Sequence, residues 1–166
     1  MNVPDAASLD LSGSWTASAW VNVTTLPANG TVVKTIAKDD GSANSNYALS
    51  LDNNDHCSGG VSWEVGFDTA GGSSYQSCYL TTINTGTWYL VTGTWNGTML
   101  TLYVNGVSVA TSTPGAVPTS SSGNPLELGN EAGNSFYVNG VIDDARVYNR
   151  ALSAIEIRDL YDATSN

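Results

Sequence analysis

Segments typical of β-strands recur along almost the whole chain, roughly every 8 to 14 residues, and this rhythm limits the possible folds more than any other feature. The segments are rich in alternating apolar, β-branched and aromatic residues, and clusters of Gly, Asn, Asp and Ser separate them. We expect strands near residues 15–23, 31–38, 46–52, 60–68, 75–83, 87–95, 98–104, 106–111, 125–130 and 136–148. The pattern predicts an all-β sandwich of two antiparallel sheets, with no helix before Ser153.

Asn-Gly pairs occupy residues 96–97, 105–106 and 139–140, and alternating apolar residues flank each pair. Asn and Gly both tolerate the positive φ angles that a type I′ hairpin turn requires. The first two pairs therefore predict a meander of three antiparallel strands.

The period of the hydrophobic pattern changes between Gly140 and Asp162. The first half reads as a strand packed on both faces, and its alternation places Asp143 on a buried face with Val141. In the second half, Ser153 and Glu156 have the spacing of a capping box, and apolar residues follow at helical intervals. We therefore expect one short amphipathic helix at the C-terminal end.

The segment YNRALS between this strand and helix resembles the end of bacterial laminin-G-like jelly-roll domains, in the concanavalin-A-like lectin/glucanase superfamily. The resemblance extends to WTASAWV at residues 15–21, GTW at 86–88 and LTLYVNGVSVA at 100–110. It implies a single jelly-roll domain over residues 1–166. In that family a further strand precedes this region, so we expect the parent protein to be longer, with neighbouring domains.

Composition excludes several partners. The chain has 166 residues, a net charge of −10 and only five Lys and Arg, so it cannot neutralise a run of phosphates. Nucleic acids, anionic membranes and polyanionic glycans are therefore disfavoured as ligands. The low fraction of charged residues, 12%, and the abundance of Ser, Thr, Asn and Gly suit a secreted β-protein. We expect an extracellular or cell-surface location.

Most of the large aromatic residues are expected in the core. The family fills the positions of Trp15, Trp20, Trp88 and Trp95 with aromatics, and Trp63 lies among apolar residues on its own strand. Because these side chains are assigned to the core, the strands leave few aromatic rings for a ligand. Tyr103 would be an outward-facing exception.

Cys57 and Cys78 are the only cysteines. They could be two free thiols, but the extracellular composition favours a disulfide between them. The loop before residue 61 would then have to fold back onto the following hairpin. Two cysteines and one histidine are too few ligands for a zinc site.

No arrangement of catalytic residues is evident, and we do not expect an enzyme. Glycosidases of this fold use a Glu-x-Asp-x-Glu strand, which the chain lacks. Glu64 and Asp68 are four residues apart, or about 13 Å along a strand, which exceeds the separation that two catalytic carboxyls need. His56 has no nucleophile motif around it.

Three polar loops are the candidate ligand-binding elements: residues 38–47, 51–60 and 129–137. They could be ordinary solvated turns, but their amides and carboxylates could also hold sugar hydroxyls beside a tyrosine ring. The candidate ligand residues are Asp40, Asn46, Asn53, Asp55, Tyr75, Asn130, Asn134 and Tyr137. The expected ligand is a neutral or weakly charged glycan, bound at the rim of the sandwich. A protein-binding spacer and a small glycoside hydrolase are the alternatives.

Asp143 is the candidate metal ligand. It matches an Asp that helps to hold a structural calcium in relatives whose last strand reads D-x-x-R-V-Y. The alternative is that backbone N–H groups, Arg146 or Arg150 satisfy its carboxylate. We expect one structural calcium.

Overall fold

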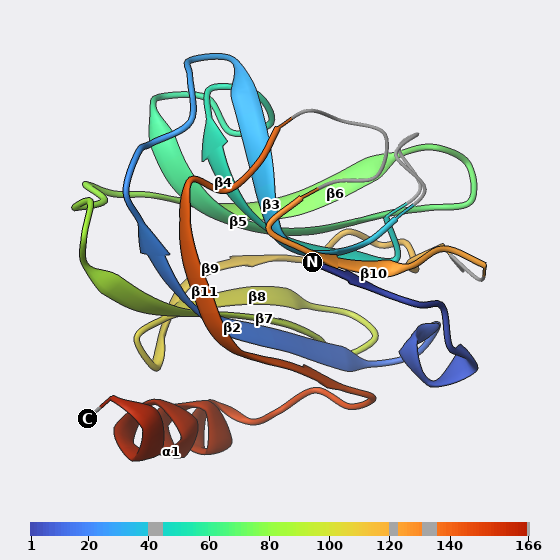
Figure 1. Ribbon diagram of the computed structural model, residues 1–166. Helices are drawn as coiled ribbons and strands as arrows, with labels where there is room; N and C mark the ends of the chain where they lie inside the picture. The colour runs from blue at the N-terminus through green and yellow to red at the C-terminus, as the bar shows by residue number, and fades with distance from the viewer. Residues whose placement is uncertain (40–44, 120–122, 131–135, 166) are drawn as a thin grey trace.

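The computed structural model describes residues 1–39, 45–119, 123–130 and 136–165. Two antiparallel sheets, one of six strands and one of five, pack face to face, and one helix lies beneath the five-stranded sheet (Figure 1). The six-stranded sheet has the order β1-β10-β3-β4-β5-β6, and the five-stranded sheet has the order β11-β2-β7-β8-β9. The predicted all-β sandwich with a C-terminal helix is confirmed.

All ten expected strands are present, with ends that differ by a few residues. The strands are β1 (Asn2–Val3), β2 (Trp15–Val23), β3 (Thr31–Lys38), β4 (Tyr47–Asn53), β5 (Val61–Asp68), β6 (Ser74–Leu80), β7 (Trp88–Trp95), β8 (Leu100–Val104), β9 (Val107–Ser112), β10 (Leu126–Leu128) and β11 (Gly140–Tyr148). The helices are the 3-10 turn η1 (Ala7–Leu9) and α1 (Ala154–Thr164). Both β1 and η1 were missed, because segments this short have no measurable periodicity.

The main core fills the space between the two sheets. Trp15, Trp63 and Trp95 are buried there, as predicted. The sheets approach each other closely at Gly93, where an added Cβ would overlap the side chain of Val65 on the opposite sheet. Gly93 is therefore required by packing rather than by a turn.

The predicted β7-β8-β9 meander is confirmed, but only one of its turns has the expected form. Asn105 and Gly106 have φ angles of 51° and 77°, as a type I′ turn requires. At the earlier pair only Gly97 has positive φ. There the Asn96 Oδ1 instead accepts hydrogen bonds from the backbone N–H groups of Thr98 and Met99.

Strand β11 contains a bulge, and the predicted burial of Asp143 is wrong. The register with β2 shifts between Asp143 and Arg146, where Asp144 adopts a φ of 48°. Before the bulge, Ile142 packs against the core while Val141 is 54% exposed, so this part of the strand has one buried face rather than two. Asp143 shares the exposed face.

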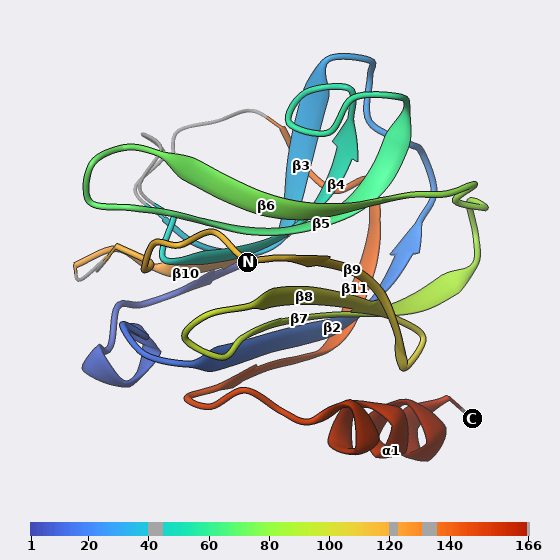
Figure 2. The same cartoon turned by 180° about the vertical axis from the view of Figure 1, so that it is seen from behind.

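Helix α1 covers part of the outer face of the five-stranded sheet (Figures 1 and 2). The predicted Ser153–Glu156 capping box is present at its start. Ile157 and Leu152 pack with Tyr103 in a second small core, so Tyr103 is buried and does not face solvent. No helix in the described part of the chain is long and apolar enough to cross a membrane.

Two of the tryptophans expected in the core lie on this outer face instead. Trp20 is half-buried against α1, with its ring centroid 5.7 Å from that of Tyr161. Trp88 is 41% exposed. Strand alternation places both on the face opposite to the main core, because their neighbours Val21 and Tyr89 pack inward.

Candidate functional site

The outer face of the six-stranded sheet is polar, and it forms a hollow. Alternate positions of β3, β4 and β5 face away from the core and carry Lys34, Ser50, Asp52, Ser62, Glu64 and Asp68. All six are buried, although they do not belong to the hydrophobic core. Buried polar groups outside a core are features of a built site rather than of a solvated surface.

We call the hollow on this face the sheet groove, which has a volume of about 240 Å³. Its strand residues are Val32, Lys34, Ala48, Glu64, Gly66, Phe67, Asp68, Ser74, Tyr75 and Gln76, and its loop residues are Ser45, Asp55, His56 and Phe136. Small residues in the middle of the sheet and long polar residues around them give the groove its depth.

The loop between β4 and β5 folds back over one end of the sheet groove because Asp52 organises its backbone. The Asp52 carboxylate accepts hydrogen bonds from the N–H groups of Asp55 at 3.3 Å, His56 at 2.8 Å and Cys57 at 3.3 Å. Such a side-chain-to-backbone turn is a common role of aspartate. The side chains of Asp55 and His56 are thereby placed at the groove.

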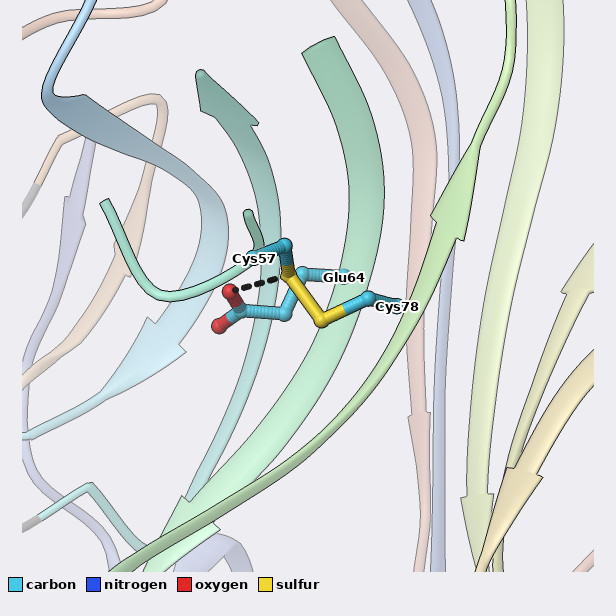
Figure 3. Close-up of side chains that lie close together, drawn as sticks. All are labelled: Cys57, Glu64 and Cys78. Atoms are coloured by element: carbon cyan, nitrogen blue, oxygen red, sulfur yellow. Dashed lines mark hydrogen bonds between the residues drawn. A yellow bond between two sulfur atoms is a disulfide. The ribbon is translucent and has the colours of Figure 1, made fainter. Parts of the chain in front are cut away.

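A disulfide fastens the same loop to the edge strand β6. Cys57 and Cys78 are bonded, with their Cα atoms 6.1 Å apart, which confirms the predicted pairing (Figure 3). The Glu64 carboxylate lies 3.4 Å from the Cys57 Sγ. A disulfide sulfur has no proton to donate, so this approach is a packing contact. Neither sulfur is a thiolate, so the three side chains do not form a metal site.

His56 and Glu64 form an ion pair at the edge of the groove. The His56 Nδ1 lies 3.1 Å and 3.2 Å from the two carboxylate oxygens. The hydrogen bond to Glu64 is the main cause that raises the pKa of His56 to about 9; the nearby Asp55 and Asp52 charges add to it, and burial opposes it. The imidazole is therefore protonated at neutral pH.

The side chains of Asp52, His56 and Glu64 are close enough together to be considered for a metal ion. A protonated imidazole, however, has no free nitrogen lone pair for a metal. Asp52 is also occupied by three backbone donors. The arrangement fits an ion pair better than a metal centre.

At the other end of the groove, Lys34 anchors the start of the β3–β4 loop. Its Nζ donates to the Asp39 Oδ2 at 2.9 Å and to the Ser45 Oγ at 3.1 Å. The Ser45 N–H in turn donates to the Asp68 Oδ2 at 2.7 Å. Both cations of the groove, Lys34 and His56, are thus already paired with carboxylates.

Two of the predicted ligand residues line the sheet groove. Asp55 lies on the folded loop and is exposed. Tyr75 borders the groove, although its ring also packs against Phe67 with centroids 5.8 Å apart. His56 and Glu64 were not proposed as ligand residues. The polar alternation of β5 could have identified Glu64.

Other predicted residues lie elsewhere. The assignment of Asn46 to the rim is wrong: its side chain is buried, and its amide bridges Leu11 to the backbone of residue 119. Asn53 is half-buried and donates to the Pro27 carbonyl at 2.8 Å. Asn130 is also half-buried, and its Oδ1 has no hydrogen-bond partner in the described ranges.

Tyr137 is 63% exposed but lines other hollows. Asp40 and Asn134 lie outside the described residues.

Asp143, the predicted calcium ligand, lies on the exposed face of β11. Its Oδ1 accepts from the Asp144 N–H at 2.7 Å, and the Asp144 carboxylate pairs with Arg146. No group of three metal-ligating side chains within residues 1–39, 45–119, 123–130 and 136–165 includes Asp143. Calcium needs six to eight oxygens. The structural calcium stays a prediction.

The two packed antiparallel sheets form a β-sandwich of the concanavalin-A-like type. A family model described as the concanavalin A-like lectin/glucanases superfamily matches residues 1–158, and the chain belongs to this laminin-G-like family. The expected family is confirmed. No curated protein matches the sequence.

Several solved structures share the fold. The binding domain of Paraclostridial Mosquitocidal Protein 1 has a TM-score of 0.78 and 21% identity, with 99% of this chain and 41% of that chain covered. Domain 4 of AbnA, a GH43 extracellular arabinanase from Geobacillus stearothermophilus, was solved with arabinotriose; it has a TM-score of 0.72 and 23% identity, with coverage of 96% and 71%.

The binding domain of Botulinum Neurotoxin DC, solved with SialylT, has a TM-score of 0.67 and 17% identity, with 93% of this chain and 36% of that chain covered. This chain therefore spans less than half the length of the two toxin domains. At these identities the likeness establishes the fold alone.

Proposed function

We propose that the protein is a non-catalytic carbohydrate-binding or adhesion domain whose ligand lies in the sheet groove. The observation that carries this proposal is a hollow whose polar side chains are held in place by internal bonds. Lys34, His56 and Asp52 are each fixed by the contacts described above. Fixed polar groups lose little conformational entropy when a ligand binds, which suits recognition of sugar hydroxyls.

The charges of the groove favour a neutral or weakly charged glycan. Because Lys34 and His56 are paired with Asp39 and Glu64, neither cation is free to attract an anion. Asp55 adds an exposed carboxylate. Together with the net charge of −10, this arrangement repels polyanionic chains.

Phe136 supplies an aromatic surface beside these polar groups. It borders the sheet groove and is 45% exposed. An exposed ring beside amides and carboxylates is the combination that binds a pyranose or furanose ring.

The solved relatives supply independent support. Two of those described above were solved with a saccharide ligand. The disulfide and the composition suit an extracellular or cell-surface protein, in which this domain would neighbour others. A shallow groove of this size suggests affinities in roughly the micromolar to millimolar range.

A glycan array, followed by calorimetry on the best neutral ligand, tests the proposal. We expect Gln76→Ala and Phe136→Ala each to weaken binding about tenfold, or about 1.4 kcal/mol. Both side chains line the groove and neither lies in the main core, so the melting temperature should stay near that of the parent. Asp159→Ala is the matched control, because Asp159 is exposed on α1.

The proposal fails if both groove variants bind the array ligand as the parent does. Binding lost in Asp159→Ala but kept in the groove variants would place the glycan site on the helix side of the molecule.

A further inference from the structure

A second hollow lies on the outer face of the five-stranded sheet, beside the C-terminal end of α1. We call it the tryptophan cleft. It has a volume of about 290 Å³ and is lined by Trp20, Trp88, Asp143, Thr164 and Ser165. It shares no lining residue with the sheet groove.

Strand register brings these side chains together. Asp143 on β11 lies directly opposite Trp20 on β2, and Trp88 on β7 lies opposite Asn22, two residues further along β2. Same-face residues at diagonal positions of neighbouring strands are within reach of large rings. The end of α1 closes one side of the cleft, where the Trp20 Nε1 donates to the Thr164 Oγ1 at 2.9 Å. The Trp20 indole is therefore held in a fixed position.

Every group at the cleft is electron-rich or neutral. Asp143 accepts one hydrogen bond from the Asp144 N–H, and the nearby Arg146 is paired with Asp144 rather than with Asp143. Helix α1 has no basic residue in its last turn, so the partial negative charge of its C-terminus is not offset there. Two indole rings, a carboxylate and a helix C-terminus all favour a positive charge.

We propose that the tryptophan cleft binds an organic cation, specifically a quaternary alkylammonium group. Indole faces attract such cations and pack against their methyl groups, and tryptophan is the best aromatic residue for this purpose. The Asp143 carboxylate supplies the counter-charge. A sugar would need several hydrogen-bond donors, but the Trp20 N–H is already used by Thr164.

The probe is choline chloride at low ionic strength, followed by tryptophan fluorescence and by shifts of the indole N–H signals in NMR. The matched control is 3,3-dimethylbutan-1-ol, which has the same shape without the charge. We expect saturable choline binding in roughly the millimolar range, and at least about tenfold weaker binding of the neutral alcohol. Added salt should weaken choline binding, because the site is exposed.

Variants separate the cleft from the rest of the surface. Trp88→Ala and Asp143→Asn should each weaken choline binding at least about fivefold while the fold survives, because both side chains are exposed. Phe136→Ala and Asp159→Asn are an exposed aromatic residue and an exposed acid elsewhere, and they should bind choline as the parent does. Trp88→Ala should leave glycan binding unchanged.

Equal binding of choline and the neutral alcohol, no saturable choline binding, or parent-like binding by both cleft variants would overturn the proposal. Flotation with phosphatidylcholine vesicles distinguishes the source of the group. If the parent protein floats with the vesicles and the Trp88→Ala protein does not, the ligand is a lipid head group. If the parent binds choline but does not float with the vesicles, the ligand is a free solute.

Discussion

His56 shows how one side chain can connect a loop to the sheet beneath it. Its backbone N–H is held by Asp52, and its ring is held by Glu64. The loop therefore depends on a charge that only the protonated imidazole carries. Few side chains change charge near neutral pH, which makes this contact sensitive to mild alkalinity.

The raised pKa of His56 has a definite effect on stability. The folded-state pKa of about 9 lies above the ordinary value of 6.5, so folding favours the protonated ring. The stabilisation is complete below about pH 6.5 and is lost as the pH rises through about 9. We expect the melting temperature of the parent protein to fall as the pH rises over this interval. The melting temperature of the His56→Gln protein should lack the part of this decrease that comes from His56.

An NMR titration of the single histidine measures its pKa directly. A midpoint near 6.5 in the folded protein would contradict the ion pair with Glu64.

The disulfide acts at the level of elements, because it joins the β4–β5 loop to β6 across 21 residues of sequence. Closing a loop of this length in the unfolded chain corresponds to about 3 kcal/mol of stability. We expect the double variant Cys57→Ser, Cys78→Ser to lose about that free energy of unfolding in urea. Glycan binding should also weaken, since Asp55 and His56 lose their anchor.

The reduced parent protein is the matched control and should behave like the double variant. Equal unfolding free energies for the oxidised parent and the double variant would refute this role.

Sequence patterns predicted the elements better than they predicted the faces of those elements. Alternation and turn residues are local signals, so β2 to β11 could be located from sequence alone. The bulge at Asp144 shifts the register by tertiary pairing and leaves no clear local signal, so Asp143 was assigned to the wrong side. Trp88 was misassigned because the family's aromatic residue at this position was expected in the core, although strand alternation places Trp88 on the face opposite to Tyr89.

The candidate site was predicted only in part for a similar reason. Polar loops can be recognised from composition, and Asp55 was found in this way. The polar face of β5 resembles a solvated strand face until the folded loop covers it. The expected disulfide between Cys57 and Cys78 indicated that the loop folds back onto the hairpin, but not that His56 would reach Glu64.

At the level of the whole molecule, the two sheets must approach closely for one core to serve both. Gly93 marks a close approach: a Cβ there would overlap Val65 and lie 2.9 Å from the Leu49 Cδ2. We expect Gly93→Ala to destabilise the protein by about 1–3 kcal/mol or more, as overpacking of a core does. Gly13→Ala is the control, because an added Cβ at Gly13 has no neighbour within 4 Å.

Thermal and urea unfolding of the two glycine variants measure this difference. A Gly93→Ala protein as stable as the Gly13→Ala protein would mean that the sheets can separate at no cost.

The sheet groove and the tryptophan cleft lie on the outer faces of the two opposed sheets of the sandwich. With no lining residue in common, a ligand on one face neither displaces nor competes with a ligand on the other, and the two affinities should be independent. A domain with both faces occupied would be a cross-linker. It would hold a saccharide and an alkylammonium-bearing partner about one sandwich thickness apart. Where both ligands belong to one surface, two weak contacts would combine into one attachment of higher overall affinity.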